Sequence, residues 1–415
     1  MYSTLESNDT NATPTPDIAV QLRSPELVER IRIRLNSLFN SSTTGLDKKQ
    51  PSAPFAGEMQ FLIFCGTRPE IIKMAPVVRA FKLANFSYKV VFTGQHRDMA
   101  EPFRRYWNIE FDTFISGVYQ PGQTLSSLVG KLISSIETQV PFAKDSVWVV
   151  QGDTSTSLAA GMVAFFRGTP IIHLEAGLRT FNHAAPFPEE LNRRTLSLLA
   201  SLHIAPTLLS ASRLETQGVE RDRIFTLGNT GIDAARLAEP NMIQPAEISH
   251  INTRLILVTL HRRENAHRLE ELYHIIGRQT PQNVTFVVPV HPNPTASRAA
   301  HAACQSYKHL HCVSPMGYGE TQWMLANSIL VLTDSGGLQE ESTWYGRPVL
   351  VLRDDTERTE AIDAGSSILI SDSAALERQL VELCAVDSQR LQKMSIRTLP
   401  FGDGYTSERL IKLLR

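Results

Sequence analysis

The hydrophobic pattern from Met59 onward alternates short apolar segments with longer helical stretches. The first series of apolar segments reads MQFLIFCG, YKVVFTG, VWVVQGD, PIIHLEAG, SLHIAPT and RIFTLGN. A second series reads RLILVTLH, VTFVVPVH, ILVLTDSGG, PVLVLRDD and SSILIS. Near-continuous Val, Ile and Leu runs separated by helices are typical of parallel strands covered on both faces. The pattern therefore predicts an α/β protein with two doubly wound, Rossmann-like domains that face a cleft.

The N-terminal segment 1–57 does not share this pattern. Its first residues are rich in Ser, Thr, Asn and Pro, which favours disorder. Ser24 and Pro25 then read as a helix cap and first helical position, and apolar residues follow at helical spacing as far as Phe39. We expect residues 1–57 to form an N-terminal extension, part disordered and part helical, outside the main fold.

Further interruptions of the pattern suggest where the domains end. The stretch LAEPNMIQPAE breaks the periodicity, so we place the first Rossmann-like domain at 58–235 and the second at 236–398. The last segment, 399–415, contains a helical pattern over Thr406 to Arg415. We expect this C-terminal helix to pack back on the first domain.

Composition and charge limit the kinds of partner. A formal net charge of −1 gives no overall attraction to nucleic acid or to an anionic membrane, so an anionic ligand has to be met by a local site. There is no apolar run long enough to span a bilayer and no apolar core of a signal peptide. The sequence has four cysteines, which form no C-x-x-C motif and are too few to suggest a disulfide framework. This cysteine usage favours a cytoplasmic location.

Common cofactor and metal motifs are missing from the sequence. No G-x-G-x-x-G follows the first predicted strand, and there is no P-loop, which argues against a dinucleotide site of the usual kind and against ATP hydrolysis by that route. His, Cys and carboxylate residues form no metal-ligand signature such as H-E-x-x-H. We therefore expect neither a cofactor nor a metal.

Two stretches resemble anion-binding strand-to-helix turns. In FCGTRPEIIKMAP, Arg68 lies at the turn and Lys73 one turn into the helix, so both side chains and the helix N-terminus could face an anion. In VLTDSGGLQEES, Ser335, Gly336 and Gly337 open a helix and allow a phosphate to approach the backbone. The alternative for Arg68 and Lys73 is an ordinary surface role, whereas a plain helix start would not need two glycines.

Two side chains near the second stretch would complete a nucleotide site. Glu341 follows one helical turn later, where it could accept hydrogen bonds from ribose hydroxyls, and Arg358 follows the next strand. Taken alone, an arginine such as Arg358 is more often a surface residue.

Acidic residues and one histidine follow other predicted strands. Asp153 comes directly after VWVVQG, at the edge where open sheets place ligands, although an aspartate there is also a common helix cap. Glu175 follows PIIHL and should point into the cleft. Glu189 and Arg193 are four residues apart on a predicted helix, so the alternative is a simple ion pair of about 0.2–0.5 kcal/mol. His261 follows the first strand of the second domain. It could act as a general acid, bind a phosphate or serve as a capping residue.

Taken together, these motifs resemble the non-hydrolysing UDP-N-acetylglucosamine 2-epimerase family. The resemblance rests on GTRPEIIK, TGQH, GDTSTS, HLEAGLRT, PFPEELNRR, GNTGID, LHRREN, PVHPNP, TDSGGLQEES and DDTER, in family order, and covers roughly residues 59 to 412. It implies a GT-B-like fold, a UDP-sugar in the interdomain cleft, a homodimer and no cofactor. It also implies interconversion of UDP-GlcNAc and UDP-ManNAc, by elimination of UDP to bound 2-acetamidoglucal and re-addition.

The same resemblance assigns roles to individual residues. It implies that Asp153, Glu175, Glu189, His261 and Arg193 are catalytic, and that the UDP-binding residues are Arg68, Lys73, Ser335, Gly336, Gly337, Glu341 and Arg358. Which carboxylate removes the proton at C2 and which returns it stays open. Gln95 and His96 match a second, allosteric site of some members, but Gly122 stands where those members have an arginine.

Departures from the family pattern keep other functions in view. The loop TFNHAAPFPEE differs from the commoner version near the sugar, so a modified UDP-HexNAc, either a diacetamido-uronic acid or a 6-deoxy sugar, is an alternative substrate. A GT-B glycosyltransferase is the alternative from another class, although three carboxylates exceed what a transferase with one base needs. A hydrolysing epimerase is disfavoured because that branch lacks the Pro-Glu found here after Gly-Thr-Arg. The N-terminal 57 residues have no family counterpart.

Overall fold

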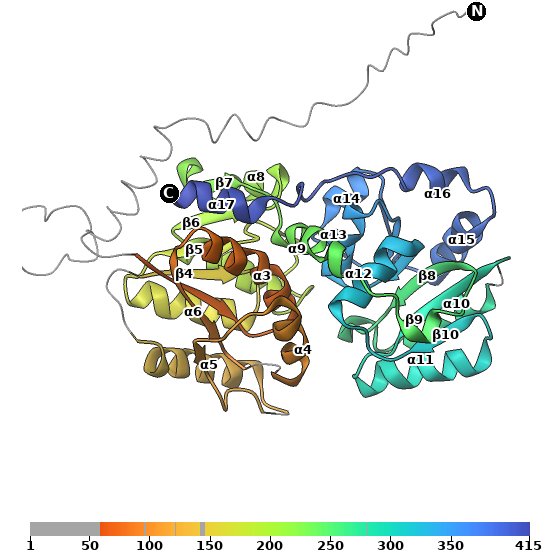
Figure 1. The fold of residues 1–415 in the computed structure, drawn as a ribbon, viewed down its shortest axis with the longest axis horizontal. Helices are drawn as coiled ribbons and strands as arrows, with labels where there is room; N and C mark the ends of the chain where they lie inside the picture. The colour runs from red at the N-terminus through yellow and green to blue at the C-terminus, as the bar shows by residue number, and fades with distance from the viewer. Residues whose placement is uncertain (1–58, 95–96, 121, 142–145, 280) are drawn as a thin grey trace, which may run out of the picture.

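Two lobes, each built on a parallel sheet with helices on both faces, make up the protein (Figure 1). The computed structural model describes residues 59–94, 97–120, 122–141, 146–279 and 281–415. The helix expected in the N-terminal extension 1–57 lies outside these residues.

The first sheet contains seven parallel strands in the order β3-β2-β1-β4-β5-β6-β7. Its strands are β1 (Gln60–Cys65), β2 (Ser87–Phe92), β3 (Thr113–Phe114), β4 (Ser146–Gln151), β5 (Ile171–Leu174), β6 (Leu202–Ala205) and β7 (Ile224–Thr226). The chain runs outward from β1 to β3 and then returns to the other side of β1. The strands β1 and β4 therefore form the topological switch point, where doubly wound sheets bind ligands.

The second sheet repeats this topology with six parallel strands in the order β10-β9-β8-β11-β12-β13. Its strands are β8 (Arg254–Thr259), β9 (Val284–Pro289), β10 (Leu310–Val313), β11 (Ser328–Thr333), β12 (Val349–Val351) and β13 (Ser367–Leu369). Here the switch point lies between β8 and β11. Together with the first sheet, this confirms the predicted fold class of two doubly wound domains.

Helices connect the strands and cover both sheets. Those between β1 and β8 are α3 (Arg68–Leu83), α4 (Arg97–Trp107), α5 (Leu125–Gln139), α6 (Ser155–Phe166), α7 (Glu189–Leu199), α8 (Leu208–Thr216) and α9 (Thr230–Ala238). The later ones are α10 (Leu269–Arg278), α11 (Pro294–Ser306), α12 (Tyr318–Asn327), α13 (Gly336–Trp344), α14 (Thr359–Asp363), α15 (Ser373–Cys384), α16 (Gln389–Met394) and α17 (Thr406–Leu414). Several begin after a residue whose side chain accepts from the first turn, such as Thr124 and Asn293.

Apolar clusters lie on both faces of each sheet, which explains the continuous apolar runs of the sequence. In β1, Ile63 joins the cluster beneath α3, whereas its neighbour Phe64 joins the cluster beneath α5 and α6. Successive side chains of a strand point to opposite faces, so a strand buried on both sides has to be apolar at every position.

The last helix, α17, packs on the first lobe although the preceding helices belong to the second (Figure 1). Leu410 and Ile411 of α17 share an apolar cluster with residues of β1 and α3. The carboxylate of Asp233 accepts from the backbone N–H groups of Thr406 and Ser407, at 3.0 and 2.7 Å. The buried aspartate therefore caps α17 from α9.

Three features differ from the sequence analysis or were missing from it. The strands β3 and β10 were not predicted, because both lie at sheet edges and are only partly buried. An edge strand does not need the continuous apolar run that marks an interior strand. In addition, Cys304 of α11 forms a disulfide with Cys312 of β10, with Cα atoms 6.0 Å apart, where no disulfide was expected.

Candidate active site

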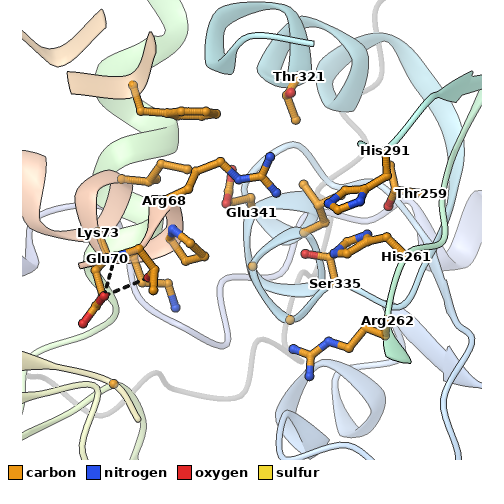
Figure 2. A pocket seen from close by; sticks show the side chains of 18 of the residues that line it. Arg68, Glu70, Lys73, Thr259, His261, Arg262, His291, Thr321, Ser335 and Glu341 are labelled. Atoms are coloured by element: carbon orange, nitrogen blue, oxygen red, sulfur yellow. Dashed lines mark hydrogen bonds between the residues drawn. The ribbon is translucent and has the colours of Figure 1, made fainter. Parts of the chain in front are cut away.

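A cavity of about 470 Å3 lies between the two lobes, at the carboxyl ends of the switch-point strands (Figure 2). Loops after β1 and β4 supply one wall, and loops after β8 and β11 supply the opposite wall. The structure brings the predicted catalytic and substrate-binding residues together in this lining: Arg68, Lys73, Asp153, Glu175, Glu189, Arg193, His261, Ser335, Gly336, Gly337, Glu341 and Arg358.

Arg68 is the first residue of α3 and extends toward the middle of the cavity (Figure 2). Its guanidinium lies over the ring of Phe103, 5.5 Å from the ring centre. The helix start is fixed by a capping box, in which Glu70 accepts from the backbone N–H of Thr67 at 2.8 Å. Burial lowers the pKa of Arg68, against the opposing effect of Glu341, so an anionic ligand would relieve the cost of burying this cation.

Lys73 lies deeper and contacts carboxylates of both lobes. Its ammonium group donates to Glu175 and is 2.8 Å from Oε2 of Glu340 on α13. Burial alone would lower the pKa of Lys73, but the two carboxylates outweigh it and leave the pKa raised. Lys73 is therefore a buried cation that joins the two lobes as well as facing the cavity.

Asp153 follows the Gly152 turn, where Gly152 has φ +68°. The helix cap of α6 is Thr154, whose hydroxyl accepts from the N–H of Ser157 at 3.1 Å. The Asp153 carboxylate instead accepts from Arg193, 2.7 Å from Nε. The capping alternative for Asp153 is therefore wrong, because its neighbour performs that task.

Glu175 sits at the end of β5 in the left-handed region, with φ +61°. Its Oε2 accepts from Gln151 at 2.8 Å and from Lys73, and its Oε1 is 3.6 Å from Arg358. Burial raises the pKa of Glu175, with Lys73 acting in the opposite direction. The carboxylate thus lies at the back of the cavity between two cations.

Glu189 is the first residue of α7, and the ion pair considered for it with Arg193 does not form. Arg193 contacts Asp153, Glu190 and Glu357 instead. Within the described chain, Oε2 of Glu189 is buried without a hydrogen-bond partner. Burial and the nearby Asp153 raise the pKa of Glu189, which favours its protonated form.

His261 and His291 form a stacked pair on the wall of the second lobe, with ring centres 4.6 Å apart (Figure 2). Nδ1 of His261 is 3.4 Å from the buried carboxylate of Asp334. The same carboxylate accepts from the backbone N–H groups of His261 and Arg262, both at 2.9 Å, and so fixes the loop after β8. Burial lowers the pKa of His261, against the effect of Asp334, and lowers that of His291 to about 4.

The N-terminus of α13 faces the cavity with Ser335 as the helix cap and two glycines behind it. A Cβ atom at Gly336 would lie 2.7 Å from Nη1 of Arg358, so the glycine allows the guanidinium to pack against the helix start. Glu341, one turn further on, accepts from Gln322, and burial raises its pKa to about 7. The residues expected to bind phosphate and ribose therefore lie together in the cavity lining.

Arg358 is buried, so the alternative of a surface role is wrong. It donates to Glu340 at 2.7 Å and to Glu357, and its guanidinium also approaches Glu175. Three arginines surround Glu357: Arg193, Arg353 and Arg358. Burial alone would raise the pKa of Glu357, but these cations hold it well below its usual range.

Several residues of the site were not singled out in the sequence. These are Glu70, Gln151, His291, Asp334, Glu340 and Glu357. His291 follows β9 in the motif PVHPNP, and Asp334 ends the run VLT before Ser335, so their positions after strands were available signals. Glu340 and Glu357 adjoin predicted residues but gave no signal, because their partners are distant in sequence.

Some expectations receive no structural test. Gln95 and His96, the candidate allosteric residues, lie outside the described residues. Among the residues that the structure does describe, no group of three or more His, Cys, Asp or Glu side chains is arranged to hold a metal ion. In the same part of the chain, no helix is long and apolar enough to cross a bilayer.

The fold and the cavity define the protein as a GT-B-like enzyme, with two Rossmann-type domains and a polar site between them. The sequence profile of the UDP-N-acetylglucosamine 2-epimerase family matches residues 79–415. The chain belongs to this family, as its motifs suggested, and is therefore an epimerase, one kind of isomerase.

Relatives and solved structures agree with this assignment. The chain is 37% identical over 375 residues to the UDP-N-acetylglucosamine 2-epimerase of Salmonella typhimurium, covering 86% of this chain and 98% of the relative. The crystal structure of UDP-GlcNAc 2-epimerase from Neisseria meningitidis bound to UDP-GlcNAc is 34% identical, with a TM-score of 0.80 over 86% of this chain and 99% of that one. The Methanocaldococcus jannaschii enzyme in complex with UDP-GlcNAc and UDP is 31% identical, with a TM-score of 0.74 over the same shares.

Proposed function

We propose that this protein interconverts UDP-GlcNAc and UDP-ManNAc by eliminating UDP and adding it back. The observation that carries the proposal is the arrangement of one cavity, with Asp153, Glu175 and Glu189 on the first lobe facing a helix N-terminus and basic groups. Family membership and the UDP-GlcNAc bound in the Neisseria meningitidis relative support the same substrate.

The reaction needs a base, an acid and groups that bind UDP while it is separated from the sugar. The proton at C2 of the sugar is not acidic by itself, so its removal is coupled to breaking the bond between C1 and the UDP oxygen. The electron pair of the C2–H bond becomes the C1–C2 double bond of 2-acetamidoglucal, and UDP leaves with the electrons of the C1–O bond. On return, C2 takes a proton on the opposite face and the UDP oxygen attacks C1 again.

The carboxylates differ in ways that suit different roles. Asp153 accepts from Arg193 and is oriented by it, which suits a proton acceptor. Glu189 has an oxygen without a hydrogen-bond partner among the described residues and a raised pKa, which suits a proton donor. Glu175 is tied to Lys73 and Gln151, so we assign it to hold the sugar and stabilise charge at the back of the cavity.

UDP is held in this proposal by groups of both lobes. Arg68 and the backbone N–H groups of Gly336 and Gly337, in the first turn of α13, face the diphosphate, with the hydroxyl of Ser335 as a further donor. Glu341 accepts from the ribose hydroxyls. The negative charge of the leaving UDP is further stabilised by Lys73, His261 and Arg358.

One incubation tests the proposal. The protein is incubated with UDP-GlcNAc in D2O, and the sugar is followed by NMR. The expected result is a mixture of UDP-GlcNAc and UDP-ManNAc carrying deuterium at C2. Unchanged UDP-GlcNAc would point to a modified UDP-HexNAc, free ManNAc would indicate the hydrolysing reaction, and transfer only after an acceptor is added would overturn epimerisation in favour of a glycosyltransferase.

A homodimer is the proposed assembly. Large apolar side chains are exposed on neighbouring helices of the first lobe, with Phe166 of α6 72% exposed and Leu198 of α7 78% exposed. Such a patch is costly in water and suits burial against a second copy. Light scattering should give twice the chain mass, and Leu198→Asp should shift the protein toward the monomer; a monomeric parent would refute the dimer.

The biological setting is part of the same proposal. UDP-ManNAc would supply ManNAc units for a surface polysaccharide, and the enzyme would act in the cytoplasm. A strain lacking the protein should lose ManNAc from its surface polymer, and unchanged polymer composition would exclude this setting.

A further inference from the structure

The turn that carries Asp153 is held from behind by two buried side chains. His173 of β5 places Nε2 2.7 Å from the carbonyl oxygen of Gly152. Asn192 of α7 donates from Nδ2 to the carbonyl of Asp153 itself, at 2.8 Å. The N–H of Gly152 donates to the carbonyl of Leu174 at 3.0 Å. Two consecutive carbonyls and one N–H of the turn are therefore fixed.

The chemistry of the His173 contact determines its tautomer. A carbonyl oxygen only accepts hydrogen bonds, so Nε2 of His173 carries the proton and donates it. Nδ1 is buried without a hydrogen-bond partner among the described residues. Burial lowers the pKa of His173 to about 4, so the imidazole is neutral around neutral pH. The ring is fully buried and is not part of the cavity wall, so it does not reach a ligand there.

We propose that His173 is a positioning residue for the epimerisation, which acts through the Gly152 carbonyl to place the carboxylate of Asp153. Gly152 has a left-handed backbone, which glycine adopts without steric cost, and the turn is kept in place by its hydrogen bonds to His173, Asn192 and Leu174. A carboxylate that is displaced by about 1 Å from its proton can lose about 100-fold in rate. The inference rests on the proposed function, because it concerns the step in which Asp153 takes part.

Two variants separate this role from simple core packing. His173→Gln can place its amide nitrogen close to the position of Nε2 and keep the donor, whereas His173→Asn is too short to reach the Gly152 carbonyl. His203 is a matched control, since it is equally buried and lies beside His173 in register on β6, with its ring edge-on to that of His173. Among the described residues its ring nitrogens have no hydrogen-bond partner, so it does not hold the turn as His173 does. His203→Asn measures the general cost of losing a buried imidazole in this sheet.

The measurements are kcat and KM for UDP-GlcNAc, the dissociation constant of UDP, and backbone hydrogen exchange of the segment 149–156. We expect His173→Asn to lower kcat by about 10- to 100-fold with UDP affinity within about threefold of the parent. It should also speed exchange in 149–156, and His173→Gln should restore most of both properties. His203→Asn should leave exchange in that segment unchanged.

The outcomes distinguish the two proposals. If the parent protein is active and His173→Asn matches His203→Asn in both kcat and exchange, the positioning role is wrong. If His173→Gln is as slow as His173→Asn, the hydrogen bond is not what matters and the role is also wrong. If the parent protein does not epimerise UDP-GlcNAc, the proposed function fails, and the exchange data alone decide whether His173 holds the turn.

Discussion

Arg193 of the first lobe binds Glu357 of the second lobe, with Nη2 3.0 Å from Oε1, while the same guanidinium holds Asp153. The two acidic residues therefore share one cation across the interface between the lobes. Because Glu357 also contacts Arg358, the position of Asp153 is linked through buried charges to a residue of the proposed UDP site. The ion pairs that join the lobes therefore also position residues of the site.

Removing the charge of Glu357 should weaken this link. We expect Glu357→Gln to lower the thermal unfolding midpoint. Removing one partner of a buried ion pair lowers the free energy of unfolding by about 3 kcal/mol, because the other charge is left buried without its counter-charge. It should also lower kcat/KM, because Arg193 and Arg358 lose their common partner. Differential scanning fluorimetry and steady-state kinetics provide the measurements.

A surface pair provides the control for Glu357. Glu382 lies 2.7 Å from Arg390 with a side chain 46% exposed, and such pairs contribute about 0–1 kcal/mol. Glu382→Gln should therefore leave both the midpoint and kcat/KM close to the parent. Equal effects of the two substitutions would argue against an interdomain role for Glu357.

Asp153→Asn should keep the fold and lose most of the activity. The amide preserves the size of the side chain but cannot take up a proton, and losing an acid–base group costs about 100- to 10,000-fold. The measurement is the rate of deuterium incorporation at C2 in D2O.

Asp372→Ala provides a control, because Asp372 is a helix cap whose carboxylate accepts from the N–H of Ala375 at 2.7 Å. Its loss should lower the free energy of unfolding by about 1 kcal/mol and leave the activity unchanged. A near-parent rate for Asp153→Asn would exclude it as a proton carrier.

Much of the fold could be predicted because most strands are buried on both faces. A strand such as β4 has four consecutive apolar residues at its centre and stands out from the helices around it. The edge strands β3 and β10 have mixed character and were missed for that reason. The order of strands within each sheet is set by packing between distant segments, which no local pattern records.

The site was predictable as a set of strand ends but not as a network. Asp153, His261 and Ser335 each follow an apolar run, and this placement alone indicated the correct edge of each sheet. The partners were not predictable: Arg193 and Glu357 are 164 residues apart and meet only when the lobes dock. For the same reason, the local spacing suggested a pair between Glu189 and Arg193 that the folded chain does not form.

Gly336→Ala should impair UDP binding. The added Cβ would lie 2.7 Å from Nη1 of Arg358, and that guanidinium cannot move away easily because Glu340 and Glu357 hold it. We expect the dissociation constant of UDP, measured by calorimetry, to rise by about tenfold, which corresponds to about 1.4 kcal/mol. On the exposed face of α5, a Cβ at Gly130 would face open space within the described part of the chain, so Gly130→Ala should add up to about 1 kcal/mol of stability with UDP affinity unchanged. Unchanged affinity in Gly336→Ala would remove the argument for a close approach at this helix start.

Glu341 should make the stability of the ligand-free protein depend on pH. Burial raises its pKa from 4.5 to about 7, so the folded protein keeps a proton that the unfolded chain releases. The stabilising contribution is complete below about pH 4.5 and is lost as the pH rises through about 7. At about 1.36 kcal/mol per pKa unit, the loss is at most about 3 kcal/mol. Glu341→Gln cannot titrate, so the difference between its unfolding midpoint and that of the parent should rise between pH 5 and pH 8. A constant difference for Glu341→Gln would show that this carboxyl is ionised throughout.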